Sequence, residues 1–279
     1  MREVLAETVT ETVEALCIRA NIVLNADIRE AFEAAMAEET SAMGCDVLGK
    51  LLENADIAVD KQLPICQDTG MAVVFVEIGQ EVHVQGGLDE AIHEGVRRGY
   101  ERGFLRKSIV RDPVRRENTK DNTPAVIHYS VVSGDRLKLT VAPKGFGSEN
   151  MSALAMLKPS DGLEGVKCAV VDAVKAAGAN PCPPIVVGVG VGGTMEKAAL
   201  MAKQALLKPV HAHHEDAFWA DTEIELLETI NALGIGPAGF GGRTTALAVH
   251  INTYPTHIAG LPVAINIGCH VTRHAEAEV

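Results

Sequence analysis

The amino-acid sequence predicts an α/β protein with a helical N-terminal segment. Apolar residues recur at helical spacing from Glu3 to about Asp60, and short apolar runs alternate with helical segments in the rest of the chain. With 279 residues, of which 47% are hydrophobic, the chain can bury a large core. We expect residues 1–279 to form a single domain.

The net charge of -12 makes nucleic acids and anionic membrane surfaces poor partners, because both would be repelled. No apolar run approaches the length of a transmembrane helix, and Met1 to Leu5 open an acid-rich amphipathic helix rather than a signal segment. We therefore expect a cytoplasmic protein that binds neither nucleic acid nor membrane. A small anionic substrate would need a local basic pocket.

The first 60 residues predict three helices, for which Asn25 and Ser41 are suitable N-caps. Two strands, 71–78 and 81–84, and a helix at 89–103 follow. The remaining expected elements are a hairpin of strands 125–132 and 136–141, helices 151–157, 163–177, 194–207 and 222–233, and strands 185–189, 245–251 and 262–267.

The stretch Pro64-Ile65-Cys66-Gln67-Asp68-Thr69-Gly70 places a thiol, an amide, a carboxylate and a hydroxyl side by side before an apolar strand. Pro64 restricts the backbone, and Gly70 can adopt the left-handed conformation that a tight turn needs. A stiff polar loop beside a strand is a common place for ligand contacts. A buried cysteine in an ordinary turn explains this stretch equally well.

The six cysteines show no CxxC pair, so metal ligands or buried thiols are expected rather than disulfides. Cys66, Cys182 and Cys269 each lie next to a strand in a loop bounded by Pro or Gly, and the prolines around Cys182 predict a rigid extended loop. These three are the candidate ligands, and their spacing matches no zinc finger, so the fold would have to bring them together. The others fall in helical segments: Cys17, Cys45 and Cys168.

Other patterns leave different functions open. Residues 188–193 match GxGxxG between a strand and a helix, but no acidic residue ends a strand about 20 residues later, so a nicotinamide cofactor is the weaker interpretation. Residues 211–216 could bind zinc or form a solvated loop, and His270 with His274 has i, i+4 spacing. The loop at 143–150 could bind an anion at a helix N-terminus.

The one markedly basic stretch of this acidic chain runs from Arg97 to Arg116. A solvated face explains most of it, but Arg106 follows the helix break at Gly103 and is well placed to grip a carboxylate with its planar guanidinium. The glycine-rich segment 234–242 is expected where the backbone must come close to another group.

Five motifs lie along the chain: Pro-Ile-Cys-Gln-Asp-Thr-Gly at 64–70, Lys-Gly-Phe-Gly-Ser-Glu-Asn-Met-Ser-Ala-Leu at 144–154, Asn-Pro-Cys-Pro-Pro at 180–184, Gly-Ile-Gly-Pro-Ala-Gly-Phe-Gly-Gly at 234–242 and Leu-Pro-Val-Ala-Ile-Asn-Ile-Gly-Cys-His at 261–270. In this order they resemble the alpha subunit, or N-terminal domain, of class I iron-sulfur fumarate hydratases and the related L(+)-tartrate dehydratases. Phe146 departs from the pattern, because relatives often have a smaller residue there. The resemblance implies mixed sheets with flanking helices.

The resemblance also implies a 4Fe-4S cluster whose fourth iron has no protein ligand and acts as a Lewis acid. Asp68 and His257 are the matching groups that can move protons, and they take supporting acid/base roles. The implied cluster ligands are Cys66, Cys182 and Cys269, and the implied contacts to the dicarboxylate substrate are Gln67, Asp68, Arg106 and Gly147, with His257 near the site.

The implied activity is the reversible hydration of fumarate to L-malate, a hydro-lyase reaction of the tricarboxylic acid cycle. We prefer it to tartrate dehydration because residues 144–154 and 254–270 look more like those of the fumarases. The resemblance further implies a separate beta subunit, a higher oligomer and an alpha subunit that is inactive alone. The rival functions are a zinc or nicotinamide enzyme and a non-catalytic assembly subunit that only carries the cluster.

Overall fold

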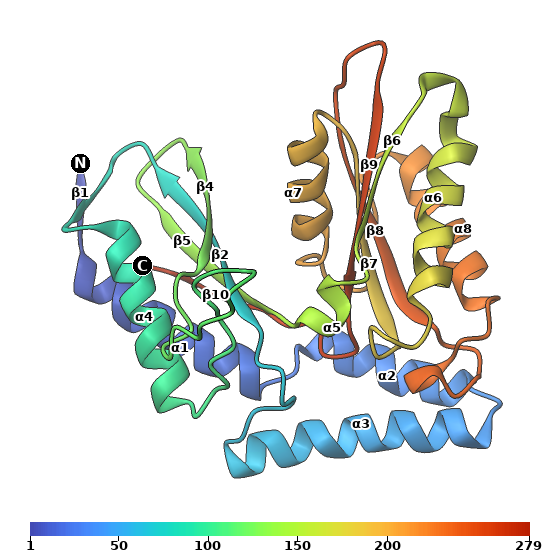
Figure 1. Cartoon of the computed structure of the whole chain (residues 1–279), viewed down its shortest axis with the longest axis horizontal. Helices are drawn as coiled ribbons and strands as arrows, with labels where there is room; N and C mark the ends of the chain where they lie inside the picture. The colour runs from blue at the N-terminus through green and yellow to red at the C-terminus, as the bar shows by residue number, and fades with distance from the viewer. The chain divides into compact units, whose positions relative to one another are not determined.

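The structure is a computed structural model that describes all 279 residues. The chain forms two compact units (Figure 1): unit 1 comprises Met1–Leu24, Asn54–Phe146 and Arg273–Val279, and unit 2 comprises Asn25–Glu53 and Gly147–Thr272. Each unit has its own mixed four-stranded sheet. The predicted α/β class with mixed sheets and a helical N-terminal segment is therefore confirmed, whereas a single domain over 1–279 stays a prediction.

The N-terminal segment contains the three predicted helices. Ser41 caps the third of them, because its hydroxyl accepts the main-chain N–H of Gly44 at 3.2 Å. None of the helices in the structure combines the length and the apolar character that crossing a membrane requires. The elements of this segment are β1 (Arg2–Leu5), α1 (Ala6–Ile22), α2 (Ala26–Glu38) and α3 (Ala42–Lys61).

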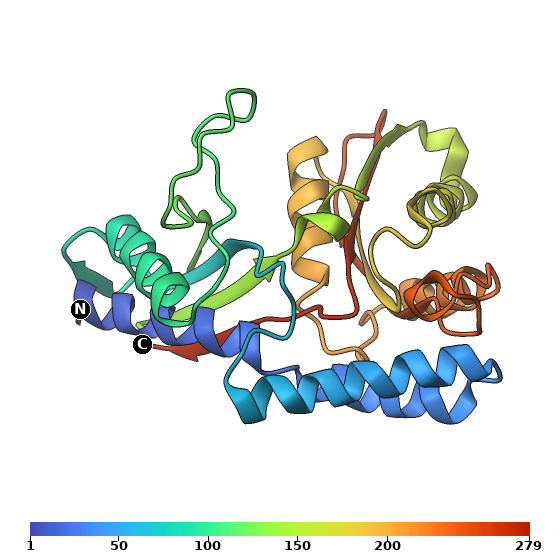
Figure 2. The same ribbon diagram turned by 60° about the horizontal axis from the view of Figure 1, so that its bottom comes forward.

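Unit 1 is completed by β2 (Met71–Gly79), β3 (Val82–Gln85), α4 (Leu88–Arg102), β4 (Val126–Val132), β5 (Leu137–Lys144) and β10 (Ala275–Glu278). Its main sheet has the order β10-β5-β2-β4, and β1 pairs with β3 apart from it. Alternate residues of β2, such as Val74 and Val76, pack with α1 and α4 in one core. These two helices lie side by side (Figure 2) and bury Tyr100 completely.

The predicted hairpin of residues 125–132 and 136–141 is wrong. Both segments are strands, but β2 lies between β4 and β5, parallel to the first and antiparallel to the second. The turn between them closes over the end of β2, where the Glu81 N–H donates to the Gly134 carbonyl at 3.0 Å. The local pattern predicts strands and a turn, whereas pairing depends on the strand that fills the space between them.

Unit 2 contains α5 (Phe146–Glu149, whose first residue belongs to unit 1), β6 (Ala153–Leu157), α6 (Gly162–Ala177), β7 (Ile185–Gly192), α7 (Met195–Ala205), α8 (Ala217–Asn231), β8 (Ala246–Tyr254) and β9 (Leu261–Gly268). The sheet has the order β6-β9-β7-β8, with β7 parallel to β8 and antiparallel to β9. Helices α6 and α8 cover one face, and α7 covers the other (Figure 1).

Residues 151–157 do not form the predicted helix. They turn out of α5 and form β6, which pairs antiparallel with β9 at the edge of the sheet. Ala, Leu and Met favour a helix locally, but the open edge of β9 offers main-chain hydrogen bonds that a helix at this place could not replace. The helices predicted at 163–177, 194–207 and 222–233 are present, with shifted ends.

The glycines of the GxGxxG pattern serve the packing of α7 against β7. Val187 and Val189 point into the core with α6 and α8, so Gly188 and Gly190 face α7. A Cβ atom at Gly190 would lie 2.1 Å from the carbonyl oxygen of Ala198. The pattern is therefore explained by close helix-to-sheet packing.

We expect Gly190→Ala to lower the free energy of unfolding by about 1–3 kcal/mol, the usual cost of an overpacked core. A Cβ at Gly49 in α3 would have no other atom within 4 Å, so Gly49→Ala is the control and should be neutral or slightly stabilising. Urea denaturation of both variants measures the difference. Equal stabilities would contradict the packing explanation.

Candidate active site

The Cys66 loop of unit 1, residues 64–70, is held in one conformation by hydrogen bonds. Gly70 has φ +73°, as a left-handed turn requires, and its Cα lies so close to Lys144 that a Cβ would meet the Lys144 main chain at 2.7 Å. Cys66 and Asp68 are partly exposed, and the Gln67 side chain is exposed. The loop is therefore a preorganised polar surface, as predicted.

Three buried side chains hold the carbonyl groups of this loop. Arg273 donates to the Asp68 carbonyl at 2.6 Å, and the Tyr100 hydroxyl lies 2.7 Å from the Thr69 carbonyl. The Asn122 amide donates to the Gly70 carbonyl at 3.2 Å. Sequence analysis missed these residues because they lie up to 205 positions away along the chain, and no local pattern marks them.

Arg106 is fixed beside the same loop by its main chain. After α4, Phe104 adopts φ +53° and Leu105 is buried, which turns the chain towards Thr69. The Arg106 N–H then donates to the Thr69 hydroxyl at 2.9 Å. The Arg106 guanidinium is exposed and makes no ion pair. Unit 1 thus brings together Cys66, Gln67, Asp68 and Arg106, with a cationic group available for an anion.

The Asp68 carboxylate stabilises the loop. One oxygen accepts the N–H of Gly70 at 3.0 Å, and the other accepts the N–H of Phe146 at 2.9 Å. A Cβ at Gly145 would lie 3.1 Å from the second oxygen, so glycine lets the 144–146 segment approach. Asp68 therefore positions the loop and the 144–146 segment, and its acid/base role stays a prediction.

In unit 2 the loops of Cys182 and Cys269 lie together. Cys182 precedes β7 and Cys269 follows β9, and these strands are antiparallel neighbours, so both cysteines lie at the same end of the sheet. The His270 N–H donates to the Cys182 carbonyl at 3.1 Å, which joins the two loops directly. Two of the three predicted ligands are therefore neighbours.

The Cys182 loop is a turn rather than the predicted extended segment. Cys182 has φ +57°, and its N–H donates to the Ala179 carbonyl at 3.0 Å. The glycine-rich segment 234–242 supports this turn, because the Ala238 N–H donates to the Pro183 carbonyl at 2.8 Å and a Cβ at Gly239 would meet the Ala179 side chain at 2.3 Å. The predicted reason for the glycines, a close backbone approach, is confirmed.

The remaining cysteines differ from the three candidates. Burial, reinforced by Glu14, raises the pKa of the Cys17 thiol to about 12, which disfavours the thiolate that a metal requires. Cys168 is exposed on α6, outside both loops. Neither unit by itself gathers three His, Cys, Asp or Glu side chains into a metal site. Cys66 belongs to unit 1, whereas Cys182 and Cys269 belong to unit 2.

Gly147 begins unit 2 within the single turn of α5. A Cβ there would have only the Asn180 carbonyl within 4 Å, at 3.7 Å. Lys203 and Asn266 both bond Glu149, at 2.7 and 2.8 Å, and hold this turn against the sheet. The predicted helix after the 143–150 loop does not exist, so the expected anion site at its N-terminus is wrong.

His257 lies apart from the two cysteines of unit 2. It belongs to the turn between β8 and β9, and the end of β8 pairs with the end of β7, whereas Cys182 precedes the start of β7. The eight residues of β7 separate these ends by about 23 Å. His257 is exposed and lines an apolar cavity with Leu163 and Trp219. Its acid/base role stays a prediction.

The polar residues at 211–216 make local contacts with α8. His213 lies 3.6 Å from the buried carboxylate of Glu223, and Asp216 caps α8 by accepting the Phe218 N–H at 3.0 Å. The segment contains no three-residue metal site. His270 and His274 lie in a turn before β10 and not on a helix, so their spacing does not put them on one helical face.

His250 in β8 is fully buried, and neither of its ring nitrogens has a hydrogen-bond partner. Burial, with the charges of Lys208 and His213, lowers the pKa of His250 to about 4. The unfolded chain binds this proton below about pH 6.5, so stability is complete above that pH and falls as the pH drops towards 4.

We expect His250→Leu to show a smaller loss of unfolding free energy than the wild type between about pH 7 and about pH 5. The exposed His83 provides the control His83→Leu, which should keep the wild-type slope. Urea denaturation across this range measures the slopes, and equal slopes for wild type and His250→Leu would contradict the buried neutral histidine.

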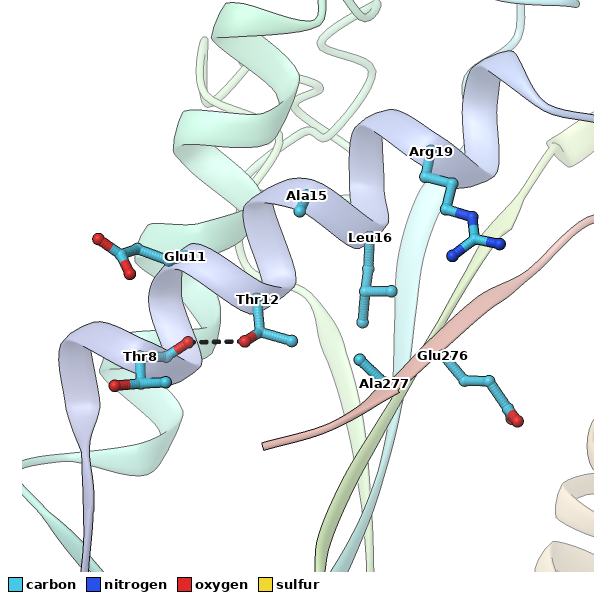
Figure 3. Close-up of a pocket in the computed structure, with 8 residues that line it drawn as sticks. All are labelled: Thr8, Glu11, Thr12, Ala15, Leu16, Arg19, Glu276 and Ala277. Carbon is cyan, nitrogen blue, oxygen red and sulfur yellow. Dashed lines mark hydrogen bonds between the residues drawn. The ribbon is translucent and has the colours of Figure 1, made fainter.

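A further open cavity in unit 1 lies between α1 and β10 (Figure 3). It is lined by apolar and charged side chains, among them Leu16, Ala277, Arg19, Glu11 and Glu276. The Thr12 hydroxyl donates to the Thr8 carbonyl at 2.8 Å and is therefore already engaged within α1. No predicted site residue lines this cavity, so the candidate active site remains the Cys66 loop with Arg106, and the paired Cys182 and Cys269 loops.

Comparison with known proteins shows the family to which this chain belongs. The chain belongs to the family described as fumarate hydratase (Fumerase), which matches residues 10–278. It is 43% identical to a putative L(+)-tartrate dehydratase subunit alpha of Methanocaldococcus jannaschii over 282 residues, 96% of each chain. It is 31% identical to the L(+)-tartrate dehydratase subunit alpha of Escherichia coli strain UTI89 over 86% of this chain and 80% of the relative, and 30% identical to that of strain K12 over 83% and 77%.

Proposed function

We propose that this chain is the cluster-bearing, alpha-type subunit of a hydro-lyase that reversibly hydrates a dicarboxylate. The main support is the direct junction of the Cys182 and Cys269 loops, through the bond from His270 N–H to the Cys182 carbonyl. The thiols of two cysteines on joined loops, and a third thiol on the preorganised Cys66 loop, are soft donors that suit an iron-sulfur cluster. Cys66, Cys182 and Cys269 would hold a 4Fe-4S cluster, which supplies a Lewis-acidic iron open to substrate.

The chain's own residues would bind and orient the substrate. Arg106, with its main chain fixed and its guanidinium unpaired, would grip one carboxylate in a bidentate contact. Gln67 presents an exposed amide for a further hydrogen bond. Gly147 leaves its main chain accessible at the start of unit 2. Both oxygens of the Asp68 carboxylate already accept main-chain N–H groups. Asp68 would therefore have to give up one of these hydrogen bonds before it could take an acid/base role.

The first candidate reaction is fumarate to L-malate. L-tartrate dehydration is the second, and the names of the similar relatives favour it. Both reactions remove water from a 2-hydroxy dicarboxylate, so the same carboxylate clamp and the same cysteines would serve either. The ratio of kcat/KM for L-malate and L-tartrate in one preparation distinguishes them, and a strong preference for tartrate would overturn the first candidate.

A beta subunit is proposed as the partner, because these relatives are named as alpha subunits and one guanidinium cannot bind both ends of a dicarboxylate. We expect the anaerobically reconstituted chain to be inactive alone and active with the beta subunit. Full activity of the chain alone would contradict the two-subunit arrangement. A loaded pair that hydrates no dicarboxylate would contradict the catalytic function and favour a subunit that only carries the cluster.

A further inference from the structure

Arg273 is a buried cation without a buried anion. It is 5% exposed, and its Nε has no hydrogen-bond partner. The one hydrogen bond of its guanidinium runs to the Asp68 carbonyl, a neutral acceptor, at 2.6 Å. No carboxylate of unit 1 forms an ion pair with Arg273. The Asp68 carboxylate itself accepts the main-chain N–H groups of Gly70 and Phe146.

Burying an unbalanced charge in this way lowers the free energy of unfolding. A guanidinium keeps its charge at every pH at which proteins are folded, so burial cannot be relieved by losing a proton. A buried charge is normally balanced by an opposite charge, and one neutral carbonyl does not provide it. The charge of Arg273 is therefore not balanced by an ion pair within unit 1.

The position of Arg273 indicates which anion could balance this charge. Its hydrogen bond ends on Asp68, two residues after Cys66, and Arg273 itself follows Cys269 by four residues. The exposed Arg106 is also attached to this loop, through Thr69, and is the group accessible to a substrate from solvent. Arg273, being buried, is closed to a substrate carboxylate, and its hydrogen bond reaches the loop two residues from the Cys66 thiol.

We propose that Arg273 is a positioning residue for the thiolate-bound cluster. Its hydrogen bond fixes the main chain at Asp68, two residues after Cys66, and its charge balances the negative charge of a cluster bound by the Cys66 thiolate. This inference rests on the proposed function. It adds a role for a residue that touches neither the substrate nor the iron and acts through the loop.

The test compares wild type, Arg273→Met, Arg273→Lys and the control Arg102→Met after anaerobic reconstitution with iron and sulfide. Arg102 is an exposed arginine of unit 1 that pairs with Glu14, so its loss changes net charge equally without touching the loop. The readouts are iron and sulfide per chain, the rate of bleaching of the visible absorbance with a chelator present, and the Tm of the cluster-free protein.

Arg273→Met should lose its cluster about 10- to 100-fold faster than wild type, the usual effect of removing a group that supports a metal ligand. Arg273→Lys should recover part of the loss, and Arg102→Met should match wild type. The Tm of cluster-free Arg273→Met should stay close to wild type, because loss of the carbonyl bond is offset by loss of an unbalanced buried charge.

Equal cluster retention in Arg273→Met and wild type would overturn the inference while leaving the proposed function intact. A large fall in Tm of the cluster-free Arg273→Met, with no rescue by lysine, would show that Arg273 only stabilises the fold. A wild-type protein that takes up no iron and sulfide would overturn the proposed function itself.

Discussion

Replacing Cys182 with serine is expected to abolish both the iron-sulfur absorbance and the hydro-lyase activity of the reconstituted protein. Serine keeps the size of the side chain but replaces a soft thiolate by a hydroxyl that iron-sulfur clusters rarely accept as a ligand. Only three cysteines lie at strand ends in the two units, so none can be spared. Cys66→Ser and Cys269→Ser should give the same result, measured by visible absorbance and iron content after anaerobic reconstitution.

The matched control is Cys168→Ser, which removes an exposed thiol from α6 and should leave absorbance and activity unchanged. Cys17→Ser is a second control, because the Cys17 thiol is fully buried and its pKa of about 12 keeps it protonated. Full iron loading of Cys182→Ser would refute the assignment of Cys182. Loss of iron in Cys168→Ser would show that absorbance does not report on the three loops alone.

Much of the fold follows from local pattern. The helices from α1 to α3 and the strands on either side of Gly79 were predictable, because helical and alternating apolar spacing reflect the face that each element buries. Pairing was not predictable in the same way. The turn within residues 125–141 was predicted correctly, yet β2 lies between the two strands that it connects. Residues 151–157 have a helical local pattern, but in the structure β6 forms there and pairs with the edge of β9.

In the candidate site, too, some features follow from the local sequence and others depend on the tertiary fold. Proline, glycine and cysteine mark the loops at Cys66, Cys182 and Cys269, because these residues restrict or free the backbone in ways that sequence reveals. The conformation of Cys182 and the place of His257 depend on the tertiary fold, and both differ from the simplest expectation. Arg273 and Tyr100 have no local signal, since their function lies in bonds to a loop that is distant in sequence.

Arg106→Met is expected to reduce kcat/KM by a factor of about 30 to several thousand, which corresponds to about 2–5 kcal/mol for an unpaired substrate carboxylate. Methionine keeps the length of the side chain and removes the planar donor pair. The Thr69 hydroxyl bonds the main chain of residue 106, so the loop and the cluster should stay intact, and the absorbance of Arg106→Met should equal that of wild type.

The control is Arg111→Met, which removes an equal charge from an exposed arginine of the same basic stretch. Long-range attraction of a dianionic substrate depends on total charge and would weaken similarly in both variants, and added salt would reduce it. A bidentate contact depends on position, so only Arg106→Met should lose most of its catalytic efficiency at high salt. Wild-type kcat/KM in Arg106→Met, or equal losses in both variants, would place the carboxylate clamp elsewhere.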